Sequence, residues 1–150
     1  EYVHNFQWMY DKVDEGSFFD VMDPNPYLDS FLSMMDRIKS LYGPYSVAIL
    51  SSLGGADMAS TGKKIAEQKI QWLEEHVFPK VSINDINFVP YASKKAEYAG
   101  PGHWLIDDQK RNVDSFNYNG NNHGILYSMG THNEDIDMLM RVVLFGKKTI

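Results

Sequence analysis

The sequence has no cysteine among its 150 residues, which excludes disulfides, thiolate zinc sites and cysteine nucleophiles. No apolar run approaches the roughly 20 residues that cross a bilayer, and residues 1–11 lack the basic-then-apolar order of a signal peptide. Basic residues are also few: 14 Lys and Arg stand against 20 Asp and Glu, a formal charge of −6 that disfavours attraction to a nucleic-acid backbone. We therefore expect a cytoplasmic protein that binds neither membranes nor nucleic-acid polymers.

The length and composition predict one globular domain. With 43% hydrophobic and 13% aromatic residues, a chain of this length can bury a core without disulfides or structural metals. No internal repeat, low-complexity tract or linker divides it. We expect a single core domain over residues 1–150, in which residues 1–24 form an irregular lead-in.

Helical and strand-like patterns alternate along the chain. Asn25 as N-cap and Pro26 at the first helical position fit a helix start, and Gly43 with Pro44 ends that helix. The second helical stripe consists of Ala66, Ile70, Leu73 and Val77. The expected strands are SVAIL (46–50), INFV (86–89), HWLI (103–106) and GILY (124–127), with shorter helical segments at 94–99 and 111–116 and a closing helix carried by Ile136, Leu139, Met140, Val143 and Leu144.

This alternation predicts an α/β fold built on a doubly wound parallel sheet. Each parallel crossover needs a connection of helix length, so helices are expected to cover both faces of the sheet in three layers. In such sheets ligands bind beyond the carboxyl ends of the strands. The side chains that follow the apolar runs are therefore the candidates for a functional site.

Three chemically distinct groups follow three of the expected strands. Ser51 comes after the first, Lys94 and Lys95 shortly after the second, and Asp107 with Asp108 directly after the third. A hydroxyl, an ammonium and paired carboxylates suit a phosphoryl group held beside Mg²⁺. Taken singly, each has a simpler interpretation: Ser51 as a turn residue, the lysines as solvated charges, and the acids as a helix cap.

Taken together, these motifs resemble a known family. The order SVAILSS, SKKAEYA, HWLIDDQKRNVDSF and NNHGILY, with GSFFDVMDPNPYLDSF upstream, is similar to the haloacid dehalogenase-like phosphohydrolases, particularly their 5'(3')-deoxyribonucleotidase branch. The resemblance covers roughly residues 16–145, and its most specific part is LIDD with GILY beyond it.

The resemblance implies a role for each strand-end residue. Ser51 matches the phosphate-binding hydroxyl residue of the second motif, and the backbone of Ser52 would add an amide. Lys95 matches the catalytic, phosphate-binding lysine of the third motif, with Lys94 as the alternative. Asp107 and Asp108 match the metal-binding fourth motif, in which the second Asp is the direct Mg²⁺ ligand and the first supports it.

The chain departs from the family at its start. Family members open with Asp-x-Asp on the first core strand, where the first Asp attacks phosphorus; no such motif precedes Ser51, and Asp11 to Asp14 (DKVD) has the wrong spacing. In the family's sheet that strand is central, so the resemblance implies a place for it between the strands ending at Ser51 and Asp107, where its loss would leave backbone groups unpaired. We therefore expect the first core strand and most of the cap to lie outside these 150 residues, with residues 1–24 a remnant of the cap connection, or a partner chain or second copy to donate the strand.

The implied activity is that of a Mg²⁺-dependent phosphomonoester hydrolase, a 5'(3')-nucleotidase acting on (deoxy)nucleoside monophosphates through an aspartyl-phosphate. The alternative is a non-catalytic binding or structural subunit that keeps the fold without the nucleophile. The base, the sugar and the position of the phosphate stay open.

Overall fold

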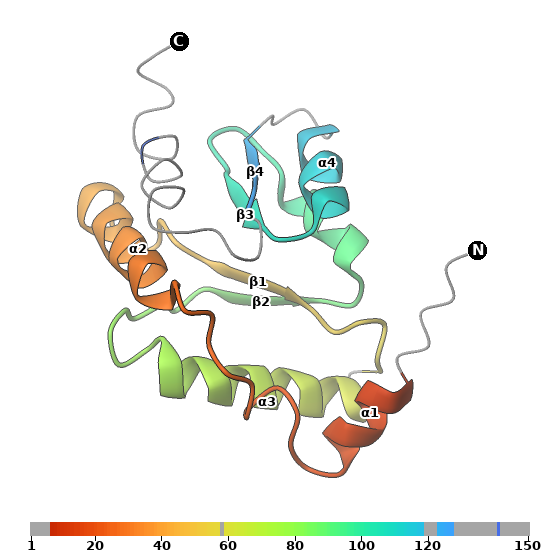
Figure 1. The fold of residues 1–150 in the computed structure, drawn as a ribbon. Helices are drawn as coiled ribbons and strands as arrows, with labels where there is room; N and C mark the ends of the chain where they lie inside the picture. The colour runs from red at the N-terminus through yellow and green to blue at the C-terminus, as the bar shows by residue number, and fades with distance from the viewer. Residues whose placement is uncertain (1–6, 58, 119–122, 128–140, 142–150) are drawn as a thin grey trace. The chain divides into compact units, whose positions relative to one another are not determined.

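The computed structural model describes residues 7–57, 59–118, 123–127 and 141 (Figure 1). Within them helices and short parallel strands alternate, so the fold is mixed α/β. The chain divides into two compact units, unit 1 (Glu1–Pro24 and Ala48–Ala92) and unit 2 (Asn25–Val47 and Ser93–Ile150). No helix in the described ranges is both long enough and apolar enough to cross a membrane.

Unit 1 is built on one parallel strand pair. β1 (Ile49–Ser52) pairs with β2 (Ile86–Val89) in a register that joins Ile49 to Ile86 and Ser52 to Val89. The connection between them contains the helix α3 (Thr61–His76), which lies alongside the pair (Figure 1). A helix in this connection is what a parallel crossover requires.

A helix near the start of the chain completes the core of unit 1. α1 (Gln7–Asp14) packs against α3 and buries Val13 fully, although residues 1–24 were expected to be irregular. Val13 joins a buried cluster with Leu53, Ile65 and Ala66. The prediction missed α1 because its apolar stripe is short and no capping residue marks its start.

Unit 2 contains a second parallel pair and its helices. The pair is formed by β3 (Leu105–Asp107) and β4 (Gly124–Leu126), in a register that joins Leu105 to Gly124 and Asp107 to Leu126. Its described residues include the helices α2 (Leu28–Tyr42), the 3₁₀ helix η1 (Ala92–Tyr98) and α4 (Lys110–Tyr118). The first residue of η1 still belongs to unit 1, and α4 contacts both strands. Gly124 allows this contact, because a Cβ there would lie 3.0 Å from the carbonyl oxygen of Val113.

Several predicted boundaries are shifted for identifiable reasons. β1 begins three residues later than expected because its ladder starts where the N–H of Ile49 donates to the carbonyl of Asp85, at 2.8 Å. β3 likewise begins at Leu105, whose N–H donates to the carbonyl of His123, and it ends at Asp107, whose carbonyl accepts the N–H of Tyr127. α2 has Tyr27, not Asn25, as its N-cap, while the Asn25 side chain accepts the N–H of Tyr27 at 2.8 Å.

Other predictions agree with the structure or lie outside it. The strand at 86–89 has the expected bounds, and η1 and α4 lie where helical segments were expected. In the described part of the chain the strands form two separate two-stranded sheets, so a continuous doubly wound sheet stays a prediction. The apolar positions of the predicted closing helix, between 136 and 144, lie outside the described residues.

Candidate functional site

The carboxyl end of β3 holds a buried ion pair. Lys95, in η1, donates from Nζ to Oδ2 of Asp107 at 2.7 Å, and the two side chains are only 14% and 4% exposed. Asp107 is buried at the last position of β3, where its carbonyl accepts the N–H of Tyr127 at 3.0 Å. A carboxylate in such a place needs compensation, and Lys95 provides it.

The other oxygen of Asp107 is bound as well. Oδ1 accepts the backbone N–H of Gln109 at 2.8 Å and the side-chain amide of Asn112 at 3.1 Å. Asn112 is itself buried in α4, so strand, turn and helix are joined through one carboxylate. The bond to Gln109 is the turn-forming bond that suits Asp before a helix, and it coexists with the lysine pair.

Asp108 differs from its neighbour. It is exposed, in the turn between β3 and α4, so its carboxylate can be reached by a cation from solvent. The described residues contain no group of three or more His, Cys, Asp or Glu that could hold a metal ion. Mg²⁺ requires less than that, because it commonly binds one or two carboxylates together with waters and phosphate oxygens. Of the two acids, Asp108 is the one with an exposed carboxylate, and a Mg²⁺ site there stays a prediction.

The structure also separates the two adjacent lysines. Lys94 points to Glu97, with Nζ 3.1 Å from Oε1, and its side chain is 50% exposed. Lys95 is the buried member and the one that reaches the acid pair. Of the two lysines, Lys95 is therefore the one at the end of β3, and its role in binding a ligand stays a prediction.

The predicted serines lie in unit 1, at the carboxyl end of β1. Oγ of Ser51 accepts from Nζ of Lys69 at 3.0 Å, and the same ammonium donates to the carbonyl of Ser52 at 2.8 Å. Oγ of Ser52 accepts the N–H of Gly54 at 3.3 Å in the turn that follows. Because Ser51 Oγ accepts from an ammonium, its own hydrogen points away from Lys69.

The residues predicted for one site are thus placed in two groups. Lys95, Asp107 and Asp108 belong to unit 2, and Ser51 and Ser52 to unit 1. Their convergence on a single ligand stays a prediction.

Sequence reasoning missed Asn112 and Lys69. Lys69 could have been noticed, since it stands three residues after Ala66 and four before Leu73 and so interrupts the apolar stripe of α3.

No family model, curated protein or solved structure matches the chain. Function is therefore inferred from the residues at the strand ends.

Proposed function

We propose that the protein is a Mg²⁺-dependent phosphomonoester hydrolase of the haloacid dehalogenase-like class, acting on nucleoside monophosphates. The observation that carries the proposal is the buried Lys95–Asp107 pair at the end of β3, with Asp108 exposed beside it. An ammonium and two carboxylates at a strand end are the groups that a metal-bound phosphate needs. The proposed fold is the doubly wound, three-layer parallel sheet.

Each side chain then has a distinct task. The ammonium of Lys95 neutralises charge on the transferring phosphoryl group, and Asp107 holds that ammonium in place at 2.7 Å. Asp108 would hold Mg²⁺, which polarises the phosphoryl oxygens when it is bound. At the end of β1, the Ser51 hydroxyl and the Ser52 amide would donate to phosphate oxygens.

The nucleophile is assigned to a segment that pairs beside β1. An aspartate there would form an O–P bond as the ester P–O bond breaks, and water would then hydrolyse the aspartyl-phosphate. Asp11 and Asp14 are unsuitable because they lie in the helix α1 rather than at a strand end. The one Asp-x-Asp of the sequence, at 135–137, lies outside the described residues. A partner chain or a second copy that donates a strand remains part of the proposal.

A second candidate function is a non-catalytic binding or structural subunit. It differs from the enzyme in having no nucleophilic aspartate beside β1. In that case the strand ends would bind a phosphorylated ligand without breaking its ester bond.

Hydrolysis of p-nitrophenyl phosphate and of deoxynucleoside monophosphates, with Mg²⁺ and with EDTA, tests the enzyme. We expect turnover that needs Mg²⁺ and that falls about 100-fold or more in Asp108→Asn, since a bound metal supplies several kcal/mol of transition-state stabilisation. Asp114→Asn is the matched control, because Asp114 is an exposed acid of α4 that pairs only with exposed Lys110 among the described ion pairs. Equal activity in both variants would contradict the assignment; no turnover in any of them, with phosphate binding retained, would favour the subunit.

A further inference from the structure

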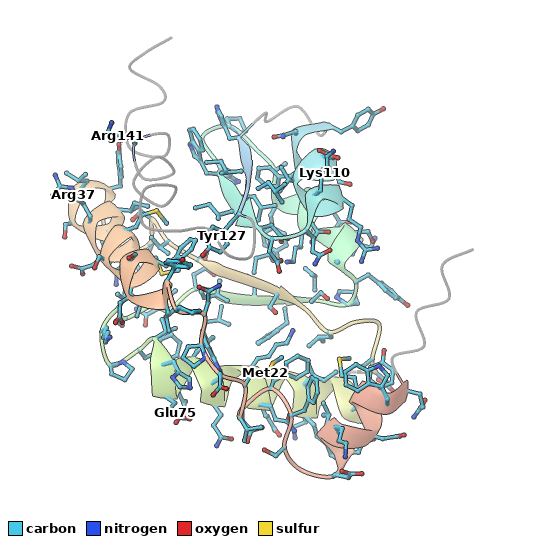
Figure 2. All side chains as sticks on the ribbon, in the orientation of Figure 1. Met22, Arg37, Glu75, Lys110, Tyr127 and Arg141 are labelled. Carbon is cyan, nitrogen blue, oxygen red and sulfur yellow. The ribbon has the colours of Figure 1, made fainter. Side chains whose placement is uncertain are left out.

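Unit 1 contains a cavity of about 280 Å³ between its strand pair, α3 and the segment after α1. Six of the nine residues that line it are apolar, and three of these carry aromatic rings: Phe19, Trp72 and Phe88. Met22, labelled in Figure 2, belongs to the same lining, and its carbonyl accepts the indole N–H of Trp72 at 2.8 Å. A cavity that is mainly apolar and aromatic, with few polar groups, is typical of a small-molecule site.

One cation is held at the wall of this cavity. Nζ of Lys69 is fixed by Oγ of Ser51 and by the carbonyl of Ser52, at 3.0 and 2.8 Å. It also lies over the ring of Phe19, 4.6 Å from the centroid. These contacts hold the positive charge in one place, so a ligand would not have to order a flexible lysine on binding.

The acidic residue of the lining is placed differently. Asp23 is exposed, so its carboxylate is hydrated, whereas Lys69 is partly buried beside aromatic rings. Solvent screens an exposed charge far more than a partly buried one. The side of the cavity next to Lys69 therefore favours an anionic ligand group.

We infer that this cavity binds a planar aromatic anion, with its ring among Phe19, Trp72 and Phe88 and its anionic oxygens against Lys69 and Ser51. Offset or edge-to-face ring contacts would hold the aromatic part, and a charge-assisted hydrogen bond would hold the anionic part. An apolar cavity of roughly 150 Å³ is enough for benzene, so the larger space here suits a two-ring ligand.

This inference does not depend on phosphate hydrolysis. Of the residues that it uses, all in unit 1, Ser51 and the backbone of Ser52 are the ones that the proposed hydrolysis also uses; Lys95, Asp107 and Asp108 lie in unit 2, and no metal ion is needed. The anionic group could be a carboxylate or a phosphate, and these two sources share the same contacts. The test therefore includes one ligand of each kind.

The experiment is isothermal titration calorimetry of the whole chain with 2-naphthoate, in a buffer with EDTA. We expect saturable binding, at least about tenfold tighter than that of the uncharged 2-naphthylmethanol, which is the scale of one charged hydrogen bond. Cyclohexanecarboxylate keeps the charge but lacks the aromatic contacts, so it should also bind more weakly than 2-naphthoate. 2-Naphthyl phosphate is the second aromatic anion; tighter binding than that of 2-naphthoate would identify the ligand as a phosphate, and weaker binding would identify it as a carboxylate.

Variants of α3 connect the binding to the cavity. Lys69→Met should weaken 2-naphthoate about tenfold, and Lys69→Arg, which keeps the charge, should stay within about threefold of the unchanged chain. Lys63→Met is the matched control, because Lys63 is an exposed lysine of the same helix, paired with Glu67. Far-UV circular dichroism checks that each variant is folded.

Equal binding of naphthoate and naphthylmethanol would overturn the inference, as would equal weakening by Lys63→Met and Lys69→Met. If Lys69→Met does not fold, the ligand comparisons and Lys69→Arg still decide. Loss of Mg²⁺-dependent hydrolysis would leave this binding unchanged, so failure of the proposed function and failure of this site give different results.

Discussion

Replacing Lys95 by Met should destabilise the protein far more than replacing its neighbour. The change removes the cation 2.7 Å from Asp107 and leaves a 4%-exposed carboxylate without its counter-charge. Breaking a buried ion pair from one side costs about 3–5 kcal/mol. Asp107 keeps two N–H donors, from Gln109 and Asn112, and the 14% exposure of Lys95 admits some water, so we expect a loss of about 2–3 kcal/mol.

Urea unfolding followed by circular dichroism measures this loss. With a slope of about 1–3 kcal/mol per molar urea, the midpoint should fall by about 1–2 M. Lys94→Met is the control, and it should cost less than about 1 kcal/mol, since its pair with Glu97 is exposed on both sides. Adding Asp107→Asn to Lys95→Met should recover part of the loss, with a coupling of about 1 kcal/mol or more. Equal midpoints for the two lysine variants would refute the buried pair.

Two further substitutions test the packing of unit 1. Gln68→Leu should lower the free energy of unfolding by about 2–4 kcal/mol, because the buried Gln68 side chain binds three backbone groups that leucine would leave unpaired. Gln71 is exposed, so Gln71→Leu should change the urea midpoint little, and similar midpoints for the two variants would contradict the reasoning. Gly62→Ala should lower the free energy of unfolding by about 1–3 kcal/mol, since the new Cβ would lie 2.6 Å from the carbonyl oxygen of Asp57 and the backbone must move. An unchanged thermal midpoint would show that this close approach is not present.

Elements with both an apolar run and clear end signals were predictable from the sequence. The strand at 86–89 and the body of α2 are of this kind. Strand ends were less predictable, because they are set by the partner: β1 extends through Ser51 and Ser52 since Phe88 and Val89 lie opposite them. An apolar run alone carries no information about where its neighbour begins and ends.

The candidate site shows the same division. The acids and lysines at the strand ends could be identified from residue type and order. Lys94 and Lys95 could not be told apart, because neighbouring residues of η1 point in different directions and only the structure shows which of the two is buried. Asn112 was missed because an asparagine in a polar helical turn carries no mark of burial, and its role appears only when α4 contacts β3.

The central claim is that the acids and the lysine at the end of β3 bind a phosphate together with Mg²⁺. Titration of the chain with inorganic phosphate, followed by phosphorus NMR with and without Mg²⁺, tests it without requiring turnover. The account predicts binding that strengthens about tenfold or more with Mg²⁺ and loses that gain in Asp108→Asn but not in Asp114→Asn. Phosphate binding that is absent, or indifferent to both Mg²⁺ and Asp108, would contradict it.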